Sequence, residues 1–358
     1  VRIMAYTNID DPSAHFQTVL HSSANAATIT NDGNSDLKPD LIWSKARGAA
    51  YNHALYDSTR GVTKYLRSNA TSAETTASSG FDLTSFNTDG FSTGNNQFNT
   101  ICGGTTYVAW QWKANGGTTS TNTDGSVNTT VQTNTDAGFS IVGYTCPDPI
   151  TNFTIGHGLG VTPDMFIIKT RDGSRNWGVY HKSLTAPAGK RNLRLNQTNA
   201  EATESTFFAN IDPTSSVIQL GQNAAVNYQG HNYIAYCFAE KQGYSKFGKY
   251  VGNGSTNGPF VYTGFKPAFV MLKRSNTTSN WIIMDNKRNT FNEMESRLFP
   301  NLDNAEQTQS TYGLDFLSNG FKLRDTVSQS NGSGSTYIYM AFAENPFTTS
   351  TGIPTTAR

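Results

Sequence analysis

The sequence predicts an all-β protein made of three tandem antiparallel β-sandwich units with a jelly-roll-like character. Three observations lead to this prediction. One motif recurs three times along the chain, which is typical of repeat proteins. Short runs rich in Val, Ile, Phe, Tyr and Trp alternate with clusters of Gly, Asn, Asp and Ser, as expected for strands and turns. Each copy spans roughly a hundred residues, a common domain size.

The repeated motif is clearest at 266–273, Lys-Pro-Ala-Phe-Val-Met-Leu-Lys. In every copy a lysine follows the proline by six residues, and two further positions follow it by fourteen and by eighteen residues. The lysines are Lys45, Lys169 and Lys273, position fourteen holds His53, Trp177 and Trp281, and position eighteen holds Asp57, His181 and Asp285. Because Trp177 and Trp281 stand at the same position among apolar neighbours, we expect both indoles to be buried.

Two more features recur in each copy. A Leu-x-x-Asn segment leads into an Ala-Glu pair, which ends at Glu74, Glu201 or Glu306, and a hydrophobic run begins at Tyr107, Tyr233 or Tyr337. The Ala-Glu segments are candidates for one short helix in each unit. The hydrophobic run starts 68, 70 and 70 residues after the motif proline, so the three copies are nearly equal in length.

These landmarks divide the chain into six segments. We expect a lead-in at 1–15, the first repeat at 16–114, a Gly/Thr/Asn-rich linker at 115–138, the second repeat at 139–242, the third at 243–347 and a tail at 348–358. The repeats are predicted to open with aromatic-led strands at Phe16, Phe139 and Phe247. The linker has no periodic apolar pattern, but Val127 and Val131 suggest that it lies extended along a neighbouring surface.

The third repeat shows the strands most clearly. They are predicted at 260–263, 268–273, 281–285, 313–316, 320–323 and 337–343. Six or seven strands in a hundred residues fit a two-sheet sandwich better than a propeller blade, because blades are shorter and need more copies to close a ring. The strand at 281–284 is apolar on both faces, so it should be covered on both sides.

Composition excludes several classes of function. The formal net charge is +1 and only 15% of residues are charged, whereas a nucleic-acid binder needs a dense Lys/Arg surface. No apolar run reaches membrane-spanning length, so we expect no membrane insertion. The three cysteines and six histidines show no metal-ligand spacing, and we expect neither a metal nor a cofactor. Cys237 lies in a strand and should be a buried, inert thiol.

The shared polar residues favour a structural role over catalysis. A residue that is present in all three copies is expected to hold the unit together, because catalysis needs one constellation at one place. The lysines are therefore expected to end a strand or to pair with an acidic neighbour, and the glutamates to be helix-turn residues. Position eighteen changes identity between the repeats, which is unlike a metal ligand. A Ser-His-Asp triad and a paired-carboxylate glycosidase site have no local signature here, so both stay open.

A surface rich in Asn, Thr, Ser, Tyr and Trp suits sugar binding through ring stacking and neutral hydrogen bonds, and it equally suits a surface that only has to stay soluble. A binding site should use loop residues that differ between the repeats. The ligand-binding candidates are Tyr228 and His231, before the last strand of repeat 2, and Asn331 with its flanking serines in repeat 3.

Several segments resemble a family of uncharacterised structural proteins of tailed phages. They are Asn-Thr-Asp-Gly-Ser at 122–126, Gly-Phe-Ser-Ile-Val-Gly-Tyr-Thr at 138–145, the loop at 154–160, Tyr-Ile-Ala-Tyr-Cys-Phe-Ala-Glu at 233–240 and Tyr-Val-Gly-Asn-Gly at 250–254. The resemblance extends over nearly the whole chain. The first repeat departs from the pattern, with Leu-His-Ser-Ser-Ala-Asn at 20–25, so its first strands could be remodelled for an interface.

This resemblance implies a virion protein without enzymatic activity and brings no known active site. The expected role is a tail fibre or appendage that contacts the host surface and its glycans. A capsid or tail decoration protein without a ligand is the first alternative, and a tailspike-type glycan hydrolase is the second. Weak binding of surface sugars needs several copies, so we expect a homo-oligomer, most simply a trimer, that contacts other virion proteins.

Overall fold

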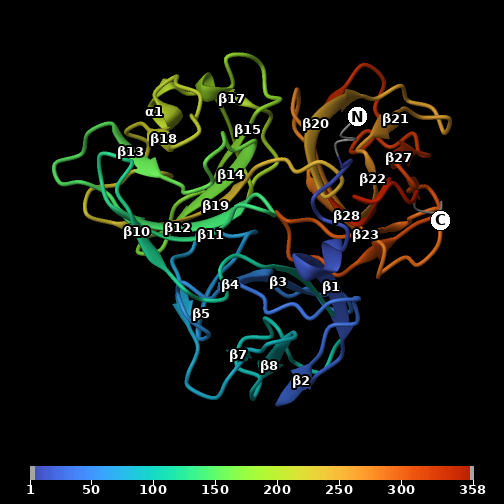
Figure 1. The fold of residues 1–358 in the computed structure, drawn as a ribbon, viewed down its shortest axis with the longest axis horizontal. Helices are drawn as coiled ribbons and strands as arrows, with labels where there is room; N and C mark the ends of the chain where they lie inside the picture. Colours follow the sequence, from blue (N-terminus) through green and yellow to red (C-terminus); the bar gives the residue numbers. More distant parts are fainter. Residues whose placement is uncertain (1–4, 355–358) are drawn as a thin grey trace.

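The computed structural model describes residues 5–354 and shows an all-β protein built from sandwich-like units, as predicted. The three repeats surround a common centre (Figure 1). Each consists of a large antiparallel sheet that faces this centre and a small sheet on the outside. No helix in the described range is long and apolar enough to cross a membrane.

The large sheets share one strand order. In repeat 1 it is β1 (Phe16–His21), β9 (Tyr107–Trp112), β3 (Leu41–Ala46), β4 (Ala54–Asp57), β5 (Lys64–Leu66) and β6 (Thr75–Thr76). In repeat 2 it is β12 (Phe139–Thr145), β19 (Asn232–Phe238), β14 (Met165–Thr170), β15 (Gly178–His181), β16 (Arg191–Arg194) and β17 (Ala202–Thr203). In repeat 3 it is β20 (Ser245–Val251), β28 (Thr336–Pro346), β22 (Phe265–Arg274) and β23 (Trp281–Asp285), followed by the pair β24 (Ser296–Arg297) and β25 (Gln307–Thr308).

The small sheets complete the sandwiches. They contain β2 (Ala27–Ile29), β8 (Phe91–Thr93) and β7 (Leu83–Phe86) in repeat 1, β13 (Phe153–Gly156) and β18 (Val217–Leu220) in repeat 2, and β21 (Phe260–Tyr262), β27 (Gly320–Leu323) and β26 (Leu314–Leu317) in repeat 3. Repeat 2 has the short helix α1 (Ser205–Phe208) before β18, where the other two repeats have β7 and β26. The remaining helical turns are η1 (Pro12–Ala14) and η2 (Ala188–Lys190).

The structure corrects three expectations. The segment 115–138 is not a plain linker, because it contains β10 (Ser120–Asn122) and β11 (Thr129–Asn134), which extend the sheet of repeat 2 beyond β12. The Ala-Glu segments form no helix; in each repeat the glutamate immediately precedes a strand, β6, β17 or β25. In repeat 3 the residue that matches Phe16 and Phe139 is Ser245 rather than Phe247, because these three residues pair with the equivalent ends of β9, β19 and β28.

The central strands of the large sheets, such as β3, β9, β14 and β23, are buried on both faces, which explains the continuous apolar runs in the sequence. In β3, Ile42 packs into the interior of its own sandwich, whereas its neighbours Leu41 and Trp43 point toward the other repeats. Strand β23 behaves in the same way, with Ile282 inside the sandwich and Trp281 facing the centre. Thus the predicted two-sided burial of this strand is confirmed, and alternate residues serve two different cores.

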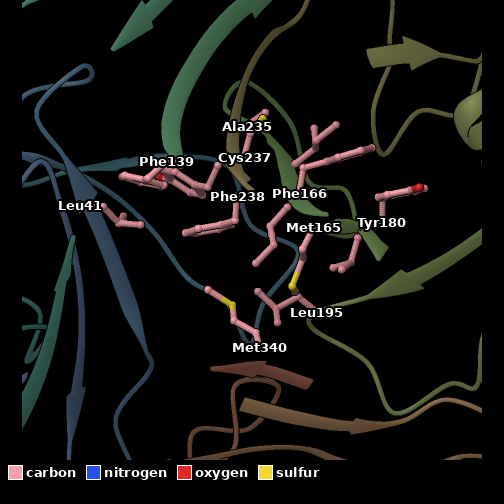
Figure 2. Packing of buried hydrophobic residues seen from close by; sticks show 14 of the residues in the cluster. Leu41, Phe139, Met165, Phe166, Tyr180, Leu195, Ala235, Cys237, Phe238 and Met340 are labelled. Carbon is pink, nitrogen blue, oxygen red and sulfur yellow. The ribbon is translucent and has the colours of Figure 1, made fainter. Parts of the chain in front are cut away.

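The centre of the molecule is an aromatic cluster to which every repeat contributes. Trp112, Phe238 and Phe342 occupy the equivalent position in β9, β19 and β28, and their ring centroids lie 5.6 to 6.3 Å apart. Figure 2 shows part of this core, to which Leu41 of repeat 1, Phe238 of repeat 2 and Met340 of repeat 3 all contribute. Because one continuous core spans all three repeats, each of them depends on the other two for burial of its inner face.

Candidate functional site

The seams between the repeats are the places where the repeated polar residues meet. At each seam the backbone N–H of the Ala-Glu glutamate donates to a backbone carbonyl of the next repeat, over 2.8 Å in all three cases. The pairs are Glu74 with Arg171, Glu201 with Ser275, and Glu306 with Arg47. Repeat 1 therefore contacts repeat 2, repeat 2 contacts repeat 3, and repeat 3 returns to repeat 1. The chain closes into a ring with pseudo-threefold symmetry.

At two of the three seams the same glutamate also forms an ion pair with an arginine. Glu74 binds the guanidinium of Arg171 through both carboxylate oxygens, at 2.9 and 3.0 Å, and Glu306 binds Arg47 in the same way, at 3.0 and 2.8 Å. At the third seam Ser275 replaces the arginine, and the carboxylate of Glu201 accepts instead from Thr185 of its own repeat. The glutamates thus join repeats, contrary to the prediction that they are helix-turn residues.

Position fourteen also links neighbouring repeats. The indole Nε1–H of Trp177 donates to the carbonyl of Arg67 at 2.8 Å, and that of Trp281 donates to the carbonyl of Arg194 at 3.1 Å. In repeat 1 the ring Nε2 of His53 reaches the carbonyl of Phe299 at 2.9 Å. The three acceptors are equivalent residues, one after the leucine of each Leu-x-x-Asn segment. Trp177 and Trp281 are fully buried, as predicted.

The asparagine of Leu-x-x-Asn holds position fourteen in place. In each repeat its side-chain oxygen accepts from the backbone N–H of position fourteen, and its amide donates to the preceding asparagine side chain. The bonded sets are Asn69 with His53 and Asn52, Asn196 with Trp177 and Asn176, and Asn301 with Trp281 and Asn280. These two hydrogen bonds hold the backbone at position fourteen in place, and the ring of that residue extends across the seam.

Position eighteen builds a buried charge network in two repeats. The carboxylate of Asp57 binds Arg60 and accepts from the hydroxyl of Tyr236, a residue of repeat 2, at 2.7 Å. At the equivalent place Asp285 binds Arg288 and accepts from the indole of Trp110, a residue of repeat 1, at 3.0 Å. In repeat 2 all three positions change together, to His181, Leu184 and Met340. The acid, its arginine partner and the hydrogen-bond donor from the next repeat are therefore present together or replaced together.

The repeated lysines are buried structural groups. Each lies one residue before the end of its strand, which agrees with the predicted strand-end role, and its ammonium donates to backbone carbonyls. Burial lowers the pKa of Lys45 to about 8 and that of Lys169 and Lys273 to about 7. In the third repeat Lys273 donates to the carbonyl of Thr198, 3.1 Å away in repeat 2. These lysines thus donate to backbone carbonyls of loops and, in repeat 3, of the seam.

Two buried histidines at the seams are held in the neutral form. Nε2 of His181 lies 3.0 Å from the carbonyl of Tyr339, and its Nδ1 accepts from the N–H of Ser183. In His53 the same nitrogen accepts from the indole of Trp43 at 2.9 Å. Because Nδ1 of each ring already faces a donor, protonation there would set two N–H groups against each other. Burial lowers the pKa of His181 to about 4 and that of His53 well below 6.5.

This arrangement predicts loss of stability in mild acid. The unfolded chain takes up protons at these histidines below about pH 6.5, whereas folded His181 does so only near pH 4. The contribution of neutral His181 to the free energy of unfolding should therefore be fully present above pH 6.5. It should be lost as the pH falls from 6.5 to 4, which lowers the free energy of unfolding by roughly 3 kcal/mol. Urea unfolding at several pH values measures this slope. A His181→Gln variant should show a shallower slope; an unchanged slope would contradict the assignment.

Of the predicted ligand-binding residues, the structure brings Tyr228 and His231 together on the surface of repeat 2. Their rings pack edge to face with centroids 4.6 Å apart, and Tyr228 is 40% exposed. Arg175, which sequence reasoning missed, places its guanidinium 4.7 Å from the Tyr228 ring centre. The backbone N–H of Arg175 donates to the carbonyl of Thr71 in repeat 1. This cluster offers an aromatic edge and a cation beside the outer rim of a seam.

Asn331 lies inside repeat 3 rather than on an exposed loop, which differs from the placement expected of a binding residue. The side chain is buried, and its amide donates to the carbonyls of Ser255 and Asp325 at 2.8 and 2.7 Å. Its counterpart Asn227 in repeat 2 is equally buried and donates to two backbone carbonyls. Each asparagine stands six residues before the tyrosine of the last strand. This shared spacing in the sequence could have indicated that both asparagines have a structural role.

The fold and its seams define a closed ring of three β-sandwich repeats in one chain. Over residues 11–346 the chain matches the family model described as a domain of unknown function (DUF7483), and it belongs to that family. Neither the curated proteins nor the solved structures include a match to this chain.

Proposed function

We propose that this protein is a structural component of a bacteriophage virion, a tail fibre or appendage without enzymatic activity that contacts glycans of the host surface. The observation that carries the structural role is the use of the repeated polar residues. The glutamates, the position-fourteen rings, the bracketing asparagines and the lysines all join or brace the repeats. What the repeats share is therefore a rigid scaffold, and the phage setting rests on the resemblance of the sequence.

The contact with glycans is assigned to the cluster of Tyr228, His231 and Arg175. Aromatic rings stack on the apolar faces of sugars, and a partly exposed tyrosine beside hydrogen-bonding groups suits this use. Arg175 covers part of the tyrosine ring and adds a donor fork that can bind hydroxyl or carboxylate oxygens of a sugar. Because a single site of this size binds weakly, the proposal includes a homotrimer that presents several copies at once.

We expect the double variant Tyr228→Ala, His231→Ala to fold like the parent and to reduce adsorption of phage particles to host cells. Both side chains lie at the surface of a rigid repeat, so their removal should leave the core intact. Particles that carry the variant are compared with parent particles in an adsorption assay, with thermal unfolding of the purified chain as the control for folding. Unchanged adsorption would favour a decoration protein.

The location in the particle needs its own experiment. Antibodies against the purified chain, visualised on virions by electron microscopy, should label the tail appendages. Label spread over the capsid or along the tail tube would overturn the fibre assignment. Release of reducing sugar from host envelope by the purified chain would favour a glycan hydrolase instead. Light scattering of the same preparation tests the trimer.

A further inference from the structure

A pocket of about 290 Å³ opens at the seam between repeats 3 and 1. Repeat 1 contributes Thr18 from β1 and the loop at 32–34, and repeat 3 contributes Ala268, Asn286 and Glu344 among others. The pocket is lined mainly by hydroxyl, amide and carboxyl side chains. The other two seams show what the chain places at the equivalent position.

In repeats 1 and 2 an aspartate fills the place of Ala268. The carboxylate of Asp40 accepts from the N–H of Ala114 at 2.7 Å and from the hydroxyl of Ser58 at 2.6 Å. In repeat 2 Asp164 accepts from the N–H of Glu240 and binds the ammonium of Lys182 at 2.9 Å. Since Ala268 supplies no carboxylate, repeat 3 has space at this point instead of an internal hydrogen-bond acceptor.

The chain also fills the outer part of the equivalent space at the seam between repeats 1 and 2. There the amide of Gln132, from β11, donates to the hydroxyls of Ser58 and Thr59 at 2.9 and 2.7 Å. The residues equivalent to this serine and threonine are Asn286 and Lys287, which line the pocket. Among residues 5–354, β1 is the edge strand of its sheet and has no neighbour that corresponds to β11, so no residue equivalent to Gln132 enters the pocket. At the seam between repeats 1 and 2, the chain therefore places an amide side chain at the position that matches the pocket.

Thr18 is the residue that points to a ligand. Its equivalents Ile141 and Phe247 are apolar core residues, which makes a hydroxyl here specific to repeat 1. The residue is only 4% exposed, and its hydroxyl has no hydrogen-bond partner within residues 5–354. In the same pocket Oε2 of Glu344 also lacks a partner from the described part of the chain. A buried hydroxyl that makes no bond is costly, so a ligand group that bonds to it gains that free energy.

We propose that this pocket binds one neutral sugar unit of a glycan. Its charges are already paired, because Lys287 binds Asp32 at 2.7 Å and Glu344 lies 3.2 Å from the ammonium of Lys266. A neutral ligand with many hydroxyls matches this mixture of donors and acceptors better than an ion does. The position of Gln132 at the neighbouring seam favours a sugar that carries an amide, an N-acetylhexosamine. The inference rests on the glycan contact proposed above and gives it a second site.

The test uses the full chain and saturation-transfer NMR with methyl N-acetylglucosaminide and methyl glucoside as probes. We expect saturable binding with a Kd of roughly millimolar order, as is usual for a single small polar ligand. Thr18→Val keeps the volume and removes the hydroxyl, and it should weaken binding about fivefold. Ala268→Asp installs the residue of the other repeats and should weaken it by more than about tenfold. Both substitutions should leave the melting temperature close to that of the parent.

The controls separate this site from the surface cluster. Sugar binding by the parent and by both pocket variants is measured in the Tyr228→Ala, His231→Ala background, which removes the surface cluster. Neither of these two residues lines the pocket, so the saturable binding that remains is assigned to the pocket. The inference is overturned if neither probe binds saturably, or if Thr18→Val and Ala268→Asp bind like the parent. Should Ala268→Asp fail to fold, Thr18→Val alone decides the matter. Loss of adsorption in the Tyr228, His231 variant together with no sugar binding in this pocket would refute only this second site.

Discussion

Replacing Trp281 with alanine is expected to lower the free energy of unfolding by about 3–5 kcal/mol. The indole is only 1% exposed, and it belongs to the core that all three repeats share. Its N–H also reaches the carbonyl of Arg194 across the seam between repeats 2 and 3. The substitution therefore removes a large buried side chain and leaves a seam carbonyl without its donor. Trp177→Ala should have a similar effect at the seam between repeats 1 and 2, where Trp177 donates to Arg67.

Because the core is continuous, the loss should appear as one cooperative transition at lower denaturant concentration, measured by circular dichroism and by tryptophan fluorescence. Trp281→Phe is the matched control, since it keeps an aromatic ring and removes the N–H; it should cost about 1–2 kcal/mol. Two separate transitions in the alanine variant would show that repeat 3 unfolds by itself, contrary to the shared core. If Trp281→Ala unfolds at the same denaturant concentration as the parent, Trp281 does not contribute to the core as described.

Much of the fold could be predicted because comparison of the three copies shows which positions they share. Strands at 281–285 and 320–323 were predicted with the bounds that β23 and β27 have, since apolar runs between turn residues locate strands well. The spacing from the motif proline also identified the buried Trp177 and Trp281. The strands β10 and β11 were missed because they are short and rich in Thr and Asn. Only Thr129, Val131 and Gln132 of β11 are buried, and no residue of β10 is.

The seams could not be predicted from the same pattern. Spacing shows that three units are equivalent, but it does not show which face of one unit meets the next. The roles of Glu74 and Glu306 depend on arginines in another repeat, 97 and 259 residues away in the chain. A helix was expected at these glutamates because the local sequence favours one, and the ion pair across the seam has no local signature. The pairing of Asp57 with Tyr236 was hidden for the same reason.

The two seam glutamates also show how charge supports the ring. Burial by itself would raise the pKa of Glu74, but the hydrogen bonds and charges of Arg171 and Arg60 hold that pKa below its usual value. Glu306 behaves in the same way between Arg47 and Arg288. Each of these carboxylates connects a seam arginine with the buried arginine that pairs with the aspartate at position eighteen. The ring contacts and the buried charge networks are therefore one system in repeats 1 and 3.

This coupling leads to the second large expected effect, at Asp285. Its carboxylate is fully buried and accepts from Arg288 and from the indole of Trp110. Burial would lower the pKa of Arg288, but Asp285 and Glu306 outweigh it, so the guanidinium stays charged in the interior. Asp285→Ala removes one of the two acids that balance this charge. The free energy of unfolding should fall by about 3–5 kcal/mol, which is the usual cost of breaking a buried ion pair from one side.

The sequence of repeat 2 supplies the matched control for Asp285→Ala. Leu184 occupies the position of Arg288 there, so a leucine is compatible with this site in the fold. The double variant Asp285→Ala, Arg288→Leu removes both charges and should recover about 2 kcal/mol relative to Asp285→Ala alone. Arg288→Leu by itself completes the double-mutant cycle, and urea unfolding of the four proteins gives the coupling energy. If the double variant is no more stable than Asp285→Ala, the unpaired guanidinium is not the source of the cost, and the lost indole bond to Trp110 becomes the larger effect.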